Sequence, residues 1–250
     1  MIFRLTAKMT LACLTAVFVY SQEVRAEDRL AYTIQLAGID VGDMEIAVER
    51  AGDRYDAKLD GRYSILFWSG SWLSQSFGTV DPNGPVPSRF QSNSESDEPA
   101  VTVINFKDPD GPVDWRRTPP APAEWTEGRL PLQKQHLRTA LDPVSALAAS
   151  VLGSVGGQSP DVCKRAVRIF TGTVVFELDF RGAKPARGNR VMCDVAYRPL
   201  SGHRQDSGSV ERLSEPGSIE ISFDRLPDGG WLPSRVSLPT PIGSLVVERS

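Results

Sequence analysis

Apolar and polar residues alternate along most of this chain, a pattern typical of β-strands whose two faces meet different surroundings. Every second residue between 174 and 180 is Val, Phe or Leu, and Glu177 and Asp179 lie between them. The run 190–198 repeats the alternation after a polar turn, so the two runs predict an antiparallel pair. Further strands are predicted at 30–36, 44–49, 55–63, 89–94, 100–107, 112–116, 210–213, 218–225, 231–238 and 242–249.

The spacing of these runs predicts an all-β domain. The 19 prolines and 21 glycines fall largely between the runs, which favours many turns and few long helices. More than ten strands in one sheet must curl or close to protect their edges. We therefore expect a strongly curved antiparallel sheet, either an open barrel or a spiral-like sheet, formed by a single domain over residues 27–250.

One segment, 142–153, has the pattern of a short helix that covers the sheet. Asp142 is well suited to the N-cap, Pro143 to the first helical position, and Gly153 to the end. The apolar residues of the segment share one face, which we expect to be buried. That face consists of Val144, Leu147, Ala148 and Val151.

The first 26 residues predict a secretory signal peptide. Two basic residues precede an apolar core at 9–20, and 24–26 form a small-x-small cleavage site. Cys13 leaves a lipoprotein as a less favoured alternative. Because no later stretch approaches the roughly 20 apolar residues of a membrane span, we expect no transmembrane segment in the mature chain and a periplasmic location.

Cys163 and Cys193 are the only cysteines that follow this leader. They lie at the far ends of the predicted antiparallel pair, where they can meet, and an exported protein reaches an oxidising compartment. We therefore predict a disulfide bond that closes a loop of about 30 residues and stabilises the fold by roughly 3 to 4 kcal/mol. The alternative is a pair of free, buried thiols.

The most aromatic stretch, 65–77, interrupts the strand pattern, and we interpret it as a short helical turn or compact loop. One account is that it plugs the open end of the curved sheet. The other is that it lines the mouth of an apolar cavity or contacts a lipid surface. The candidate ligand-binding residues are Phe67, Trp68, Trp72, Leu73 and Phe77.

The segment 118–131 is rich in proline, and we expect a long surface excursion with extended conformation. Trp115 and Trp125 flank its proline-rich part, 118–123. Packing of this excursion onto the sheet is the favoured interpretation, and a peptide-contact surface is the alternative.

Little in the chain predicts catalysis. The only histidines are His136 and His203, no nucleophile elbow occurs, and no metal-ligand or phosphate-loop spacing is present. We therefore expect no enzyme activity, metal or cofactor. Two acidic pairs could bind calcium or act as paired carboxylates, but their turn settings favour ordinary turn residues. They are Asp108 with Asp110, and Asp224 with Asp228.

The charge of the chain argues against nucleic acid as a partner. The formal net charge is −3, and loss of the leader's three basic residues and one acidic residue makes it −5. No basic cluster offsets this acidic balance.

Several short motifs resemble the exported domain-of-unknown-function family 3108. They are Ile39-Asp40-Val41-Gly42, the helix start at 142–147, Cys163 with 170–172, and the run 193–202. The resemblance implies a periplasmic, largely antiparallel β protein. It transfers no catalytic residue, because the family has no established reaction. Members usually carry Phe-Asp-Gly and an arginine after the first cysteine, where this chain has Thr171 and Thr173.

Three functions compete on these grounds. The favoured one is a non-enzymatic periplasmic module that holds an apolar or lipid-like ligand in the concave face of the sheet, under the 142–153 helix. The second is an envelope structural or assembly factor that acts through contacts with another envelope protein, using 118–131 or an uncovered sheet edge. The least favoured is a carboxylate-based hydrolase.

Overall fold

The computed structural model describes residues 26–107, 110–152, 162–186, 188–226 and 231–250. The strands are β1 (Ala26–Leu36), β2 (Ile39–Ala51), β3 (Arg54–Ile65), β4 (Trp68–Asp81), β5 (Gly84–Glu95), β6 (Ala100–Lys107), β7 (Gly111–Thr118), β8 (Arg165–Phe170), β9 (Val175–Pro185), β10 (Arg190–Ser201), β11 (Ile219–Arg225), β12 (Trp231–Thr240) and β13 (Gly243–Arg249). The helices are α1 (Ala123–Thr126), α2 (Lys134–Leu137), α3 (Pro143–Val151) and α4 (Gly208–Ser214). The predicted signal peptide lies outside the described residues except for Ala26.

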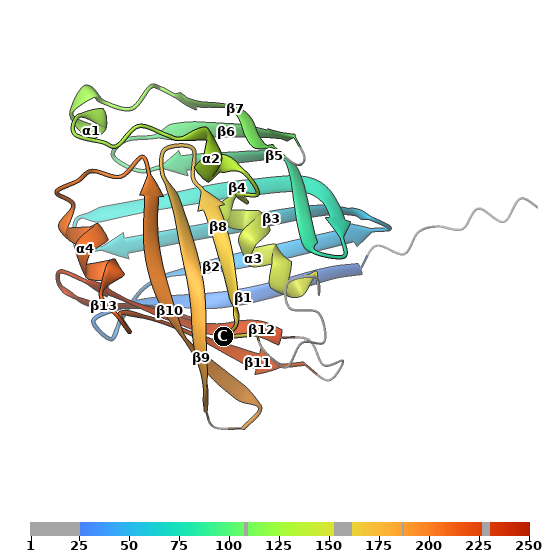
Figure 1. The fold of residues 1–250 in the computed structure, drawn as a ribbon. Helices are drawn as coiled ribbons and strands as arrows, with labels where there is room; N and C mark the ends of the chain where they lie inside the picture. Colours follow the sequence, from blue (N-terminus) through green and yellow to red (C-terminus); the bar gives the residue numbers. More distant parts are fainter. Residues whose placement is uncertain (1–25, 108–109, 153–161, 187, 227–230) are drawn as a thin grey trace, which may run out of the picture.

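All strands form one antiparallel sheet of 13 strands, in the order β7-β6-β5-β4-β3-β2-β1-β13-β12-β11-β10-β9-β8 (Figure 1). The first and last strands of the chain, β1 and β13, pair with each other from Tyr32–Arg249 to Leu36–Leu245. Each half of the chain is therefore a meander that grows outward from this central pair. The all-β prediction is confirmed, since strands make up 64% of the described residues and the sheet is nearly closed into a barrel.

The two edge strands, β7 and β8, come together through side chains and through the segment before α3. The rings of Trp115 on β7 and Phe170 on β8 meet edge to face, with centroids 5.1 Å apart. Leu141 donates a backbone hydrogen bond to Arg168 O (2.9 Å) and accepts one from the N–H of Phe170 (2.8 Å). These bonds occupy part of the free edge of β8, which would otherwise be open to pairing with another chain.

Gly111 permits the matching close approach at the start of β7. Its φ of +79° suits glycine, and a Cβ at this position would lie 2.2 Å from the carbonyl oxygen of Leu137. Any other residue would therefore push the segment that follows α2 away from the edge.

Helix α3 lies inside the curve of the sheet, between the strands of the two halves (Figure 1). Asp142 is its N-cap and accepts a hydrogen bond from Ser145 N, and Pro143 occupies the first turn, as predicted. Val144 and Ala148 are completely buried against the first half of the sheet. The prediction of a short covering helix is confirmed for 143–151, and Gly153 lies outside the described residues.

The interpretation of 65–77 as a helical turn or loop is wrong. Ile65 and Trp68 form the last cross-strand pair of a hairpin, Leu66 and Phe67 make its two-residue turn, and β4 continues to Asp81. The spacing of four between Trp68 and Trp72 fits one face of a strand as well as one face of a helix, so the periodicity could not separate the two.

The predicted strand at 210–213 is also wrong, because these residues lie in α4. The side chain of Ser207 accepts a hydrogen bond from Val210 N and caps this helix. An alternation of apolar and polar residues over only four positions is weaker evidence than a serine at the N-cap position.

The excursion at 118–131 contains α1 and packs onto the end of the sheet. Leu130 donates a backbone hydrogen bond to His203 O (2.8 Å) and accepts one from Gly202 N (3.0 Å). Trp115, which precedes the excursion, packs against the core. The favoured interpretation, packing onto the sheet, therefore holds for the described residues.

The predicted disulfide is present: Cys163 and Cys193 are bonded, with their Cα atoms 5.2 Å apart. It connects the chain just before β8 to β10, and both cysteines are buried in an apolar cluster of the second half that includes Phe180 and Phe223. The bond thus holds a sheet edge to a strand two places further into the sheet.

Replacing both cysteines with serine is expected to lower the free energy of unfolding by about 3 to 4 kcal/mol, because the unfolded chain regains the entropy of a 30-residue loop. Urea denaturation of the C163S/C193S variant and the wild type measures the difference. Reactive thiols at Cys163 and Cys193 in the unreduced wild type would contradict the bond, whereas a reactive thiol at Cys13 would not.

Candidate functional site

An apolar groove lies inside the sheet, between α3 and the strands of the second half. Its volume is about 260 Å³. Helix α3 contributes small residues, Ala146 and Ser150, together with Leu147, so space is left between helix and sheet. The strands contribute Val167, Ile169, Phe176, Leu178, Phe180, Ile221, Phe223, Pro233 and Val236.

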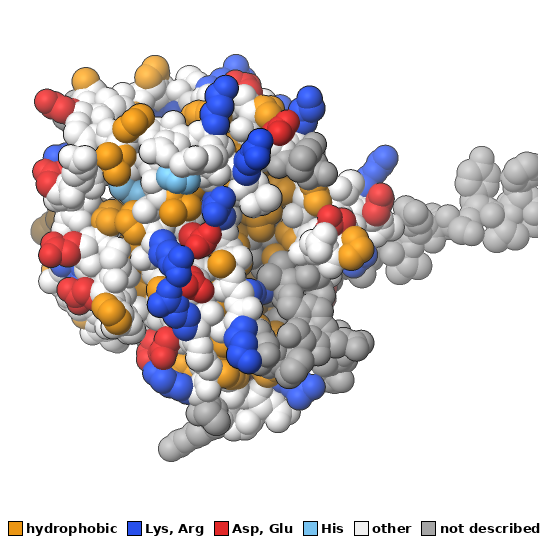
Figure 2. All heavy atoms as spheres, in the orientation of Figure 1, with side chains coloured by type: hydrophobic (Ala, Val, Ile, Leu, Met, Phe, Trp, Pro, Cys, Tyr) orange, Lys and Arg blue, Asp and Glu red, His pale blue; other side chains and the backbone are white. Residues whose placement is uncertain are grey.

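Strands β8, β9 and β10 have a charged outer face that contrasts with the groove. Glu177 binds Arg168 (3.1 Å) and Arg198 (3.7 Å), and Asp179 binds Arg198 and Arg181 (both 2.6 Å). Figure 2 shows blue and red side chains side by side over this part of the surface. Because side chains alternate between the two faces of a strand, Glu177 and Asp179 face away from the groove-lining residues between which they stand.

Arg165 is the one charged residue that lines the groove. Its guanidinium lies over the rings of Phe180 and Phe223, with 4.8 Å and 5.4 Å from its central carbon to the ring centroids. Burial lowers the pKa of this side chain to about 10, so the arginine is still charged at neutral pH. The negative π faces of the two rings stabilise that charge inside an otherwise apolar site.

A buried polar cluster fixes the other side of α3. The carboxylate of Asp142 accepts hydrogen bonds from Ser145 N (2.9 Å), Ser145 Oγ (2.6 Å) and Ser76 Oγ (2.8 Å). Since Ser145 Oγ–H is used in this way, Tyr55 Oη donates to Ser145 Oγ at 2.7 Å. Ser76, Asp142 and Ser145 are completely buried and Tyr55 is nearly so, so the helix start is bonded to β3 and β4.

Desolvation by burial raises the pKa of Asp142 above its ordinary value of 3.8, and the hydrogen bonds from Ser145 and Ser76 oppose the shift. Desolvation also raises the pKa of Tyr55, and the nearby Asp142 charge adds to it. Ser76 and Ser145 are completely buried, so neither hydroxyl is placed to attack a substrate. The geometry therefore describes an anchor for α3.

The histidines do not complete a catalytic arrangement with this cluster. His203 is buried, with Nε2 at 3.1 Å from Val175 O and 3.4 Å from Tyr197 Oη. Burial lowers the pKa of His203, so its ring is neutral at pH 7. His136 lies on α2, which follows the excursion.

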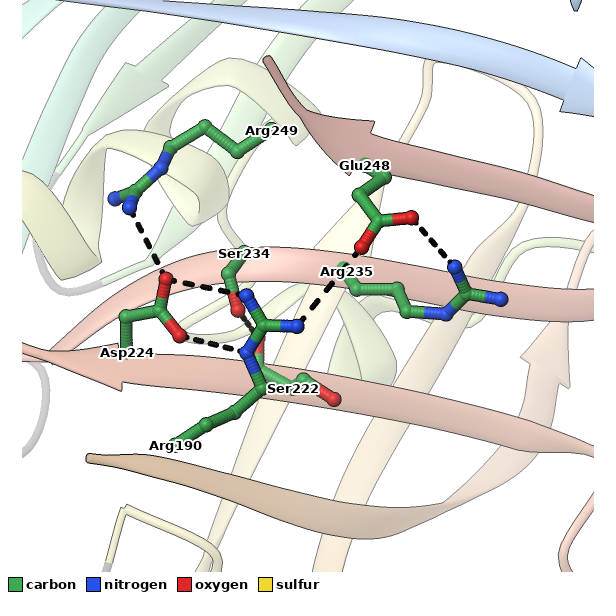
Figure 3. A network of polar contacts seen from close by, with 7 residues as sticks. All are labelled: Arg190, Ser222, Asp224, Ser234, Arg235, Glu248 and Arg249. Carbon is green, nitrogen blue, oxygen red and sulfur yellow. Dashed lines mark hydrogen bonds and ion pairs between the residues drawn. The ribbon is translucent and has the colours of Figure 1, made fainter. Parts of the chain in front are cut away.

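Asp224, one of the predicted acidic pair residues, belongs to a network of ion pairs across β10 to β13 (Figure 3). Its carboxylate binds Arg190 (2.7 Å) and Arg249 (3.0 Å). Arg235 binds Glu248 at 2.6 Å on the neighbouring strands. The hydrogen bond from Arg190 holds the pKa of Asp224 below its ordinary value. These ion pairs connect neighbouring strands of the sheet. Asp108 and Asp228, which belong to the predicted acidic pairs, lie outside the described residues.

None of the five aromatic and aliphatic candidates from 65–77 lines the apolar groove. Phe67 and Trp68 are exposed at the β3–β4 turn, and Leu73 is also exposed. Trp72 packs against the core and covers Gly61, where a Cβ would lie 2.2 Å from its ring. Phe77 lines a separate hollow.

That hollow is larger, about 920 Å³, but it mixes apolar residues such as Phe77, Val86 and Phe106 with four charged side chains, those of Glu49, Asp53, Arg54 and Asp56. Binding sites for small organic molecules are mostly apolar with few polar groups. We therefore regard the smaller, apolar groove as the candidate site.

Sequence reasoning missed Arg165 as a groove residue, although a signal exists. Arg165 is in phase with Val167 and Ile169 on the same strand, so the alternation places it on the inner face. A charged residue on the inner face of an edge strand is therefore the sequence signal that could have identified Arg165 as a groove residue.

Among the described residues, no group of three or more His, Cys, Asp and Glu side chains is placed to hold a metal ion. Within the same residues, no helix has the length and apolar character needed to cross a membrane.

A family model described as "Protein of unknown function (DUF3108)" matches residues 31–250. Comparisons with curated proteins and with solved structures found no significant match. The family description names no activity, ligand or partner.

The raised pKa of Asp142 predicts a pH-dependent stability. Between the unfolded pKa, about 3.9, and the higher folded pKa, the folded state binds more protons than the unfolded state. Stability therefore falls as pH rises through this window and is constant above it.

Asp142→Asn removes this titration while keeping an oxygen that can accept from Ser145 N. The stability of the wild type relative to D142N is therefore expected to decrease as pH rises above about 4. Urea denaturation of both proteins over a pH series measures the difference. A difference that stays constant with pH would contradict a raised pKa at Asp142.

Proposed function

We propose that this chain, which belongs to the DUF3108 family, is an exported periplasmic protein without enzymatic activity that binds an apolar or lipid-like ligand. The binding site is the groove between α3 and strands β8, β9, β11 and β12. The observation that carries the proposal is the groove's lining, which is aliphatic and aromatic except for Ser150 and Arg165.

The size and shape of the groove favour a slender ligand. Its 260 Å³ is slightly below the roughly 300 to 1,000 Å³ of typical small-molecule pockets, so a single acyl chain suits it better than a bulky ring system. The small side chains of Ala146 and Ser150 leave room for such a chain along the helix.

Export is supported by two independent features. The first 26 residues have the charge and apolar pattern of a signal peptide. The Cys163–Cys193 bond is of the kind that forms and persists in oxidising compartments such as the periplasm.

A non-enzymatic role is supported by the chemistry around α3. The buried serines donate their hydrogen bonds to a carboxylate, and the buried histidine is bonded to a backbone carbonyl and a tyrosine. These groups are buried and their polar atoms are hydrogen-bonded, so they stabilise the fold and offer no accessible nucleophile or general base.

Filling the groove is expected to abolish binding. Ala146→Phe places a ring in the groove, and the affinity for the apolar probe N-phenyl-1-naphthylamine is expected to fall at least about tenfold, which corresponds to losing the burial of roughly two methylene groups. Probe fluorescence on the exported protein measures the affinity, and native mass spectrometry of protein taken from the periplasm tests for a co-purified ligand.

Ala183→Phe is the matched control, because Ala183 is exposed on β9, and it should bind the probe like the wild type. Should A146F fail to fold, Val167→Thr makes the groove more polar at nearly constant volume and serves instead. Equal probe binding by the wild type and a folded groove variant would overturn the proposed site.

A further inference from the structure

Three hairpin turns at one end of the sheet carry large apolar side chains that point into solvent. These side chains are from 59% to 95% exposed, far more than the residues of the core. We name this group the apolar rim. It consists of Ile39, Leu66, Phe67, Trp68 and Ile242.

The sheet order makes the rim one continuous surface. Strands β4, β3, β2, β1, β13 and β12 are consecutive neighbours, so their connecting turns lie side by side. Ala37, in the β1–β2 turn, donates a backbone hydrogen bond to Ser244 O (2.9 Å), next to the β12–β13 turn. Gly42 on β2 is paired with Tyr63 on β3, close to the β3–β4 turn.

The residues at the β3–β4 turn are poorly suited to the turn itself. Two-residue hairpin turns favour glycine, asparagine or aspartate at the central positions that have a positive φ. Here Leu66 has a φ of +52°, a conformation that is strained for a bulky residue. Leu66 thus gains neither local backbone preference nor burial, and Phe67 gains no burial. Such violations of local rules concentrate at functional positions.

The rim is apolar and almost without charge. In the turn segments 37–42, 64–70 and 239–244 the only charged residue is Asp40, which accepts a hydrogen bond from Gln35 Nε2 at 2.8 Å. The next turn in the sheet is acidic, with exposed Glu95, Asp97 and Glu98. A strongly anionic surface would therefore be repelled, and a net-neutral one would not.

We propose that the apolar rim inserts into the interfacial region of a net-neutral phospholipid bilayer, so that the protein docks on a membrane surface end-on. Highly exposed apolar side chains on adjacent turns can enter a fluid bilayer without a complementary shape, whereas a protein partner would need a matching surface. Tryptophan and phenylalanine side chains at the boundary of a bilayer suit this depth. The rim shares no residue with the groove, so this inference does not depend on what the groove binds.

The test is co-sedimentation of the exported protein with phosphatidylcholine vesicles. The wild type is expected to bind, to bind no better when phosphatidylglycerol is added to the vesicles, and to keep its binding at high salt. Leu66→Asn with Phe67→Gly is expected to lower the partition coefficient at least about tenfold, since two large apolar side chains no longer leave water.

The double variant also separates binding from folding. Asparagine tolerates the positive φ of position 66 better than leucine does, so L66N/F67G is expected to stay folded, with an unfolding temperature close to that of the wild type. Val113→Asn removes an exposed apolar side chain on β7, outside the rim, and should leave vesicle binding unchanged. The groove variant A146F should also keep it, so failure of the proposed groove and failure of the rim give different results.

Three results would overturn the inference. The first is a wild type that stays in solution with vesicles of every composition. The second is an L66N/F67G variant that binds vesicles like the wild type. The third is a photo-crosslinker at position 67 that, in cells, captures a protein or a second copy of this chain and no lipid.

Discussion

The two residues before α3 connect the two halves of the sheet, and the rest of the fold depends on this connection. The backbone of Leu141 is hydrogen-bonded to β8, at one edge of the sheet. The side chain of Asp142 is bonded to Ser76 on β4, deep in the other half. A sheet of 13 strands has two edges to protect. Because this dipeptide contacts both halves, it fixes the curvature that brings those edges together.

A fully buried carboxylate is costly, so its hydrogen bonds decide whether the connection stabilises the fold. Asp142 accepts from one backbone N–H and two hydroxyls, and Tyr55 extends the chain of donors. The cluster thereby satisfies the start of α3, where unpaired N–H groups would otherwise be buried. With the helix held in this way, its Val144 face packs on the first half of the sheet. The face of α3 that carries Ala146 points toward the second half of the sheet, where the groove lies.

The sequence was enough to predict the features that depend on local patterns. Strand alternation predicted the sheet, Asp142-Pro143 predicted the start of α3, and the two cysteines outside the predicted leader predicted the disulfide. Failures occurred where two patterns fit the same residues. Trp68 and Trp72 suit a helix or a strand, and the short run in α4 suited a strand until the Ser207 cap is considered.

The groove could not be predicted in the same way, because its walls come from distant parts of the chain. Alternation marks Phe176, Leu178 and Phe180 as inward-facing, but it does not say whether a helix fills the space against them. The groove forms because Ala146 and Ser150 line it together with these strand residues. Their proximity results from the closure of the sheet over long sequence distances. The buried partners of Asp142 are likewise distant, since Ser76 is 66 residues away in sequence.

The groove and the apolar rim lie at different positions along β12. The groove is lined by Pro233 and Val236, whereas Ile242 of the apolar rim lies in the turn after Thr240, the last residue of that strand. At about 3.3 Å per residue, Val236 and Thr240 are separated by roughly 13 Å of strand. Residues more than about 7 to 10 Å apart that share no partner contribute almost additively. The groove and the rim are therefore two energetically separate surfaces on one rigid sheet, and a change at either one leaves the other's chemistry intact.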